Sequence, residues 1–326
     1  MNVFAMRTAL TGIKPTHVPH LGNYFGAIRP ALRLVESHRT AFFIADYHAL
    51  TTVRDPNALR GYVYDVAASW LACGLDPART IFYRQSDVPQ VFELSWILSC
   101  FVATGQLERG VSYKDALAKG ESPNAGILCY PLLMAADILV FDADVVPVGA
   151  DQKQHLELTR DLATRINHVY GEGTLVVPEP LVTEAPLVPG IDGQKMSKSK
   201  GNTIPLFIGS KQLRKLCLSI VTNSEPLEAP KVAQGSTVYE LFKLVASPEE
   251  AKAMEEKLAR GGYGWGHAKE ELYEVLEALL APMRDRFSQF RNDPGELDRI
   301  LKQGAERARE VAAQTLERVR ARIGIR

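Results

Sequence analysis

Cysteine is scarce in this 326-residue sequence, which contains only four. Cys73, Cys100, Cys129 and Cys217 lie far apart in apolar surroundings, without a Cys-x-x-Cys pair or companion histidines. This pattern gives no support to a disulfide framework or to a structural zinc site. We therefore expect four reduced cysteines in the core of a cytosolic protein.

Net charge and long apolar runs are also lacking. Lysine plus arginine number 38, as do aspartate plus glutamate, so no overall field attracts nucleic acid and any such contact must be local. The most apolar stretch, residues 126–140, is interrupted by Asp137 and is too short to span a bilayer. No basic segment followed by an apolar run opens the chain, so we expect no secretory signal and no membrane partner.

What the sequence does have is a basic loop at residues 195–202, Lys-Met-Ser-Lys-Ser-Lys-Gly-Asn. Turn-forming residues flank it at 191–193 and 201–202, so the loop lies between two anchored ends. Its three ammonium groups and two hydroxyls suit the spread negative charge of a polyphosphate. A solvated basic loop is the alternative interpretation of these residues by themselves.

The N-terminal stretch predicts a strand, a tight loop and a helix. Residues 7–11 form a strand candidate closed by Gly12, and apolar residues recur at helical spacing over 21–37. A helix N-terminus in this arrangement is a ready site for an anion. There, Gly22 lets a flat base approach the backbone, and His20 and Asn23 can donate to a phosphate. Taken alone, His20 is more often a surface or core histidine.

Apolar periodicity predicts an α/β fold followed by a helical region. The expected strands are 41–45, 80–83 and 145–148, and the expected helices before the basic loop are 56–71, 88–102, 127–141 and 153–170. Residues 178–189 have no regular pattern. After the loop, the expected helices are 206–221, 236–246, 248–259, 269–287 and 294–323. We expect the last of these to be a solvated amphipathic helix. Its basic strip is able to touch a nucleic-acid backbone and consists of Arg307, Arg309, Arg318, Arg320 and Arg322.

Polar residues at two places suggest a binding pocket. His48 follows the apolar strand 41–45, and residues at the carboxyl end of such a strand face the ligand crevice; a helix-capping role is the alternative. Tyr130, Met134 and Asp137 lie on one side of a helix, at intervals of four and three. A carboxylate in so apolar a helix costs free energy unless a donor reaches it. Pairing with a nearby Arg or Lys is the structural alternative for Asp137.

These motifs together resemble the tryptophanyl-tRNA synthetases among the class I aminoacyl-tRNA synthetases. Residues 195–199, Lys-Met-Ser-Lys-Ser, resemble the second class I signature, and residues 12–16 with 20–27, Gly-Ile-Lys-Pro-Thr and His-Leu-Gly-Asn-Tyr-Phe-Gly-Ala, resemble the first. Residues 134–137 and 148–161 are also close to the tryptophanyl pattern. A tyrosyl enzyme would be expected to differ around Asp151 and Gln152.

The resemblance implies a Rossmann-like parallel sheet and an ATP-dependent activity. Residues 1–205 would be the catalytic domain, with a connecting insertion at about 50–125 that carries the homodimer contact. Residues 206–295 would be a helical anticodon-binding domain and 296–326 a C-terminal helix. The implied reaction activates L-tryptophan with Mg²⁺-borne ATP and transfers it to tRNA(Trp) in the cytoplasm, without a metal held by the protein. A binding or regulatory paralogue, a tyrosyl-type enzyme and a related adenylyltransferase remain alternatives.

The resemblance also implies roles for individual residues. The catalytic residues would be His20, Asn23, Lys195 and Lys198. The ATP-binding residues would be Lys14, Pro15, Thr16, Gly22, Asn23, Lys114, Gly149, Ala150, Asp151, Val188, Lys195, Met196, Ser197, Lys198 and Ser199. Tryptophan would be bound by His48, Tyr130, Met134, Asp137 and Gln152. The chain departs from the commoner bacterial pattern at Lys14, where Gln is usual, and at His17, where Gly is usual.

Overall fold

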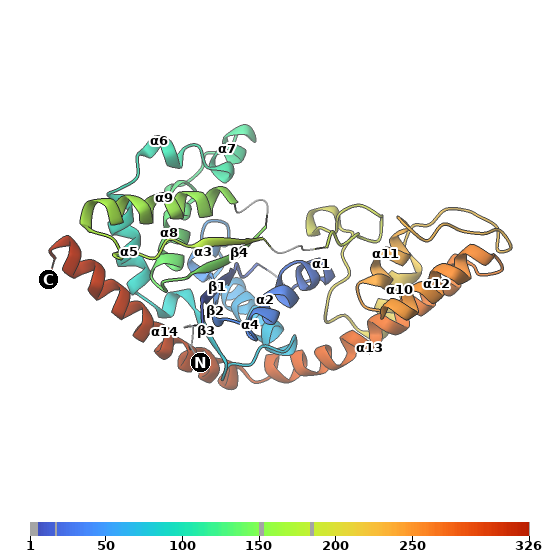
Figure 1. The fold of residues 1–326 in the computed structure, drawn as a ribbon. Coiled ribbons are helices and arrows are strands. Elements are labelled where there is room, and N and C mark those ends of the chain that lie inside the picture. Colours follow the sequence, from blue (N-terminus) through green and yellow to red (C-terminus); the bar gives the residue numbers. More distant parts are fainter. Residues whose placement is uncertain (1–5, 17, 150–152, 183–185, 326) are drawn as a thin grey trace, which may run out of the picture.

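The computed structural model describes residues 6–16, 18–149, 153–182 and 186–325, which include a parallel sheet of five strands (Figure 1). The strands are β1 (Thr8–Ile13), β2 (Arg39–Ile44), β3 (Thr80–Arg84), β4 (Val145–Val148) and β5 (Glu179–Val182). Their order is β3-β2-β1-β4-β5, and every neighbouring pair is parallel. This is a Rossmann-like sheet, as the sequence predicted.

Helices cover both faces of this sheet. Side chains alternate along β2: Phe42 and Ile44 enter a core shared with α4 (Pro56–Ala72), whereas Ala41 and Phe43 enter a second core. That second core contains residues of α5 (Gln90–Ser99), α8 (Ala125–Leu139) and α9 (Lys153–Tyr170). The continuous apolar run of β2 is therefore explained by burial on both sides.

Shorter elements connect these layers. The first helix is continuous over α1 (Leu21–Asn23), η1 (Tyr24–Ile28) and α2 (Arg29–Leu34). The remaining short elements of this part are α3 (Asp46–Ala49), η2 (Gln85–Asp87), α6 (Thr104–Leu107), α7 (Val111–Ala118) and η4 (Lys198–Lys200). The expected insertion at 50–125 includes α4 and the sheet strand β3, with α6 and α7 on the outside of the body (Figure 1).

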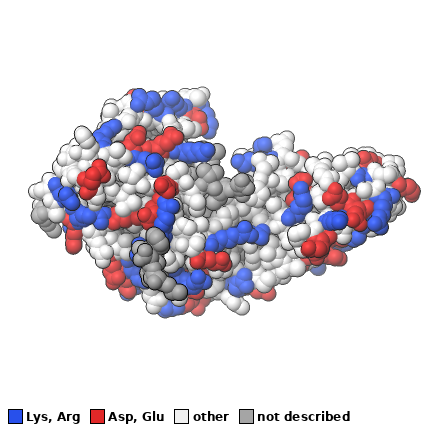
Figure 2. Space-filling model, viewed as in Figure 1, with Lys and Arg blue, Asp and Glu red and all other residues white. Residues whose placement is uncertain are grey.

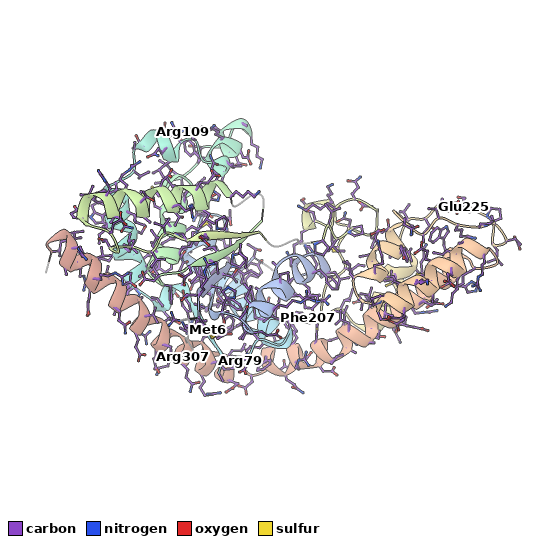
Figure 3. All side chains as sticks on the ribbon, in the orientation of Figure 1. Met6, Arg79, Arg109, Phe207, Glu225 and Arg307 are labelled. Atoms are coloured by element: carbon purple, nitrogen blue, oxygen red, sulfur yellow. The ribbon has the colours of Figure 1, made fainter. Side chains whose placement is uncertain are left out.

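The region after the basic loop is helical, as predicted. Its helices are α10 (Ser210–Leu218), α11 (Thr237–Lys243), α12 (Pro248–Arg260), α13 (Trp265–Arg291) and α14 (Pro294–Ile323). The long helix α13 runs from this region toward the sheet, where α14 continues along the body (Figure 1). Phe207 stacks on Phe287 at this junction, with ring centroids 4.1 Å apart and planes 7° from parallel (Figure 3). None of the helices in the described residues has the length and apolar character needed to cross a bilayer.

The prediction of an irregular stretch at 178–189 is wrong, because its first part is strand β5. Glu179–Val182 pairs in parallel with β4, with Pro180 opposite Val146. Proline cannot donate to a strand ladder, which argued against a strand in the sequence, but β5 is an edge strand and has only one neighbour. Short edge strands of this kind have no apolar pattern of their own to reveal them.

The expectation of four core cysteines is wrong for two of them. Cys73 and Cys217 are buried, but Cys100 and Cys129 are exposed, and all four are free thiols. Cys100 caps the end of α5, and Cys129 lies in the first half of α8, before the buried run that begins at Pro131. Both cysteines lie toward the end of a helix, where the body of the protein no longer covers the side chains, and an apolar neighbourhood in sequence does not disclose this.

The helix α14 is amphipathic with an exposed polar face, as predicted, but it is packed on the body more extensively than the sequence indicated. Its apolar face is buried in the core beside the sheet, and Leu297, Ala308 and Val319 have no exposed surface. Four of the arginines that we considered for a tRNA backbone instead donate to groups of this chain: Arg307, Arg309, Arg318 and Arg320. The amphipathic pattern predicted an apolar face correctly, but not that the sheet body would cover it.

The closest approach of α14 to the sheet is at Gly304, and it gives a stability prediction. A Cβ on Gly304 would lie 1.7 Å from the carbonyl oxygen of Phe82 in β3, a contact that only backbone movement can relieve. We expect Gly304→Ala to lower the free energy of unfolding by about 1 to 3 kcal/mol, measured by chemical denaturation. Gly61→Ala in α4 is the control, because a Cβ there meets nothing within 4 Å. Gly61→Ala should be at least as stable as the parent, because alanine favours a helix interior. If Gly304→Ala were also as stable as the parent, the close packing of α14 on β3 would be refuted.

Candidate active site

A cavity of about 610 Å³ opens at the carboxyl ends of the strands. Its lining includes Thr11 and Gly12 at the end of β1, Ala45 and His48 after β2, and Pro147 of β4. The sheet order reverses between β1 and β4, and ligands of open parallel sheets bind at such a switch point. The topology therefore places the cavity where a substrate is expected.

Four of the five predicted tryptophan-binding residues line this cavity. His48 comes from α3, and Tyr130, Met134 and Asp137 come from one side of α8. The N-cap Asn124 accepts from the Ile127 N–H, which fixes the start of α8 and so the direction of these side chains. The fifth residue, Gln152, lies outside the described residues.

Asp137 is buried in the cavity wall and accepts hydrogen bonds from two side chains. His48 Nε2 donates to Oδ2 over 2.9 Å, and Gln85 Nε2 lies 2.9 Å from both carboxylate oxygens. Burial raises the pKa of Asp137, and the hydrogen bonds from His48 and Gln85 oppose that rise. The structure thus gives Asp137 a His and a Gln as partners, not the Arg or Lys of the structural alternative.

Tyr130 is held by residues from two other helices. Its hydroxyl lies 3.0 Å from Ser112 Oγ of α7 and is hydrogen-bonded to Nε2 of His155 on α9. His155 is buried, and its ring contacts that of Tyr130 edge-on. Sequence analysis missed Gln85, Ser112 and His155. Gln85 follows strand β3 directly, so the strand-end rule that found His48 would also have found it.

A second group of predicted residues forms at the N-terminus of α1. His20 Nδ1 accepts from the Gly22 N–H over 3.1 Å, and the His20 N–H donates to Asn23 Oδ1. Burial, and after it the Lys198 ammonium, lower the pKa of His20 to about 4. His20 is therefore neutral at physiological pH. Because Nδ1 accepts, the ring proton is on Nε2, which is available as a donor to an anion.

The basic loop reaches this same group. Met196 Sδ accepts from the Gly22 N–H over 3.4 Å, and the Met196 N–H donates to the Val188 carbonyl over 2.9 Å. Lys195, Lys198 and Ser199 are exposed and Ser197 is half-buried. The loop thus brings the Lys198 ammonium near enough to His20 to lower its pKa, and Lys195 lies on the same loop.

Asn202 fastens the base of the loop. Its Oδ1 accepts from the Ser197 N–H over 2.8 Å, and its Nδ2 donates to Asp192 Oδ1 over 2.7 Å. This hydrogen bond lowers the pKa of Asp192. A Cβ on Gly190 would lie 2.4 Å from the Asn202 amide, so glycine is needed for the close approach. The sequence had indicated only a turn at Asn202.

The remaining predicted residues are distributed around these two groups. Lys14 lines the cavity, donates to Thr51 Oγ1 over 2.9 Å, and has its pKa lowered by burial. Pro15 and Thr16 follow it, and Gly149 is exposed at the end of β4. Lys114 is exposed on α7 and is not part of the cavity lining. Ala150, Asp151 and His17 lie outside the described residues.

Comparison with known proteins agrees with this geometry. Residues 6–281 match the family model "tRNA synthetases class I (W and Y)". The chain therefore belongs to the class I tRNA synthetases of this family. It is 46% identical to a tryptophan--tRNA ligase of Rhodopirellula baltica, over 97% of this chain and 99% of that protein.

Solved structures give the same result. The tryptophanyl-tRNA synthetase of Campylobacter jejuni, complexed with ADP and tryptophan, is 42% identical with a TM-score of 0.92, over 97% of this chain and 99% of that one. A tyrosyl-tRNA synthetase of Archaeoglobus fulgidus, complexed with L-tyrosine, is 21% identical with a TM-score of 0.67, over 86% and 90%. The latter is a likeness of fold alone.

Proposed function

We propose that this chain is a tryptophan--tRNA ligase. It activates L-tryptophan with Mg²⁺-borne ATP to tryptophanyl-AMP and pyrophosphate, and transfers the tryptophanyl group to the terminal ribose of tRNA(Trp). The observation that carries this proposal is Asp137, an acceptor held in the wall of a largely apolar cavity. The indole ring offers one N–H donor and no acceptor, so it matches such a carboxylate.

The first step needs positioning and charge neutralisation more than covalent chemistry by the protein. The tryptophan carboxylate oxygen attacks the α-phosphorus of ATP, and the bond from that phosphorus to the bridging oxygen of pyrophosphate breaks. Negative charge gathers on the departing pyrophosphate. The Nε2–H of neutral His20 and the ammonium groups of Lys195 and Lys198 supply positive charge and hydrogen-bond donors there.

The other residues bind the two substrates. We assign Gly22 to the adenosine, the Val188 main chain to the adenine, and Gly149 with Asp151 to the ribose side. Further ATP contacts fall to the rest of the predicted set: Lys14, Pro15, Thr16, Asn23, Lys114, Ala150, Met196, Ser197 and Ser199. Tyr130 and Gln152 hold the α-ammonium of tryptophan, while His48 and Met134 bound its ring.

We further propose that the protein is a cytoplasmic homodimer and that each chain has three parts. Residues 1–205 form the catalytic domain, 206–295 the anticodon-binding domain and 296–326 the C-terminal helix. The dimer contact lies within the 50–125 stretch, on the outer face of α5. Trp96 of α5 is 73% exposed, and exposed Tyr47 packs on Phe92 of the same helix, with ring centroids 4.4 Å apart. Large exposed aromatic groups of this kind are typical of protein interfaces.

Two assays test the function. Tryptophan-dependent exchange of pyrophosphate into ATP, with magnesium present, should be readily measured, and purified tRNA(Trp) should become charged. Exchange without charging would indicate the binding or regulatory paralogue, and exchange with tyrosine in place of tryptophan would indicate the tyrosyl alternative. If neither amino acid supported exchange, the assignment would be refuted.

A further inference from the structure

The side chain of Gln85 is wholly buried, yet the reaction as described gives it no part. Gln85 begins η2, directly after strand β3, and its Nε2 lies 2.9 Å from both oxygens of Asp137. It is therefore the only side-chain amide, among the described residues, that is hydrogen-bonded to the carboxylate in the cavity wall.

The orientation of this amide is fixed by the backbone. The Tyr47 N–H lies 3.1 Å from Gln85 Oε1, and a backbone N–H can only donate. The amide oxygen must therefore face Tyr47, and the Nε2 group must face Asp137. His48 Nε2 lies 2.9 Å from the same carboxylate and donates to it in the tautomer that carries the ring proton on Nε2. A hydroxyl of protonated Asp137 that faced the Gln85 NH₂ group would set donor against donor, which is unfavourable.

We infer that Gln85 is a positioning residue for the choice of amino acid, because its amide holds Asp137 as an ionised acceptor in the cavity wall. This inference depends on the proposed function, in which Asp137 accepts the indole N–H. Gln85 does not touch the substrate. It acts through Asp137, in a chain from the Tyr47 N–H through the Gln85 amide to the carboxylate.

The inference has a pH consequence with a defined sign. Hydrogen bonds to the charged form stabilise it, so removal of the Gln85 donor should raise the pKa of Asp137 further above its ordinary value. Tryptophan use would then be lost at a higher pH as the solution is acidified. The titratable groups that act on Asp137 are His48 on α3 and Tyr83 on β3. The other titratable groups in the cavity lining are Lys14, Asp115, Lys119, Glu121 and Tyr130.

The test uses Gln85→Met and Gln85→Glu in the full-length chain, assayed by pyrophosphate exchange over a range of pH. Methionine keeps the length of the side chain and removes the donor. We expect kcat/KM for tryptophan to fall roughly tenfold. In the plot of kcat/KM against pH, the fall on the acid side (the acid limb) should move to higher pH. The value for phenylalanine, which has no ring donor, should stay close to that of the parent. Gln106→Met on α6 is the matched control and should change neither.

Glutamate at position 85 keeps the acceptor for the Tyr47 N–H but faces Asp137 with a second carboxyl group. Two carboxyls at such a distance share a proton, so the acid limb should move further than in Gln85→Met. A double-mutant cycle completes the test: in an Asp137→Ala background, Gln85→Met should cause no further loss for tryptophan. Thermal midpoints establish that each variant folds, and the glutamate variant still tests the inference where the methionine variant does not fold.

Three results would overturn the role of Gln85: equal losses for tryptophan and phenylalanine, an unmoved acid limb, or additive losses in the cycle. In each of these cases the parent protein would still show normal tryptophan-dependent pyrophosphate exchange. A parent that shows no exchange with tryptophan would instead refute the proposed function, and this inference with it.

Discussion

Replacing Lys195 or Lys198 by alanine is expected to slow the formation of tryptophanyl-AMP by roughly 10² to 10³ fold, the usual cost of one well-placed electrostatic donor. Both residues lie on the loop that Met196 joins to Gly22, and the Lys198 ammonium acts on the neutral ring of His20. These ammonium groups would stabilise chiefly the transition state, in which negative charge gathers on the departing pyrophosphate. The loss should therefore appear in the rate and much less in tryptophan binding.

The measurement is the single-turnover rate of activation, with tryptophan affinity measured separately. Lys200 supplies a matched control, because it lies on the same loop and is exposed, and its Nζ donates to Gln194 Oε1 over 2.8 Å. Lys200→Ala should leave the rate close to that of the parent. If Lys195→Ala and Lys198→Ala behaved like Lys200→Ala, the loop would be the solvated basic run that its composition also allows.

Replacing Asp137 by alanine is expected to cost tryptophan much more than phenylalanine in the exchange assay. A hydrogen bond to a charged group contributes about 1.5 to 3 kcal/mol, which is a loss of roughly 10- to 100-fold for tryptophan. Phenylalanine has no ring N–H, so its complex with the parent protein already leaves the Asp137 carboxylate without a donor from the substrate. Tyrosine can donate, but its hydroxyl lies at the end of a longer ring, so the cavity shape, with Met134 as a wall, must reject it.

The comparison of two substrates separates recognition from support of the helix. Alanine at 137 also leaves His48 and Gln85 without their acceptor, which affects the fold and both substrates alike. Asp137→Asn is the matched control, since it keeps the shape of the side chain but places an amide NH₂ among donors. We expect it to impair tryptophan use as well. An equal loss for tryptophan and phenylalanine in Asp137→Ala would show that Asp137 only supports α8.

The balanced net charge of the sequence is matched by a mixed distribution of charge over the surface. Lysines and arginines alternate with aspartates and glutamates over the face seen in Figure 2, without a large area of one sign. Composition does not tell where individual charges are used. The arginines of α14 show this. Arg320 donates to Glu93 of α5, and Arg307, labelled in Figure 3, donates to the carbonyls of residues 77 and 80.

The sequence by itself determined the elements and the two signatures. Most strands and helices were predicted because apolar periodicity is a local property of each segment, and α9 and α14 begin and end at the predicted residues. Asp137 was found for a local reason too, since a carboxylate in an apolar helix requires a donor. The sequence could not name that donor, because the donor lies on another element.

Only the tertiary structure decided which residues act together. Parallel strands bring His48 and Gln85 to the carboxylate from positions 89 and 52 residues away in the chain. The same packing joins Gly22 to Met196 across 174 residues, closes β5 onto the sheet edge, and covers α14. Such contacts depend on how elements far apart in sequence are placed side by side, and the periodicity of any one segment carries no information about that placement.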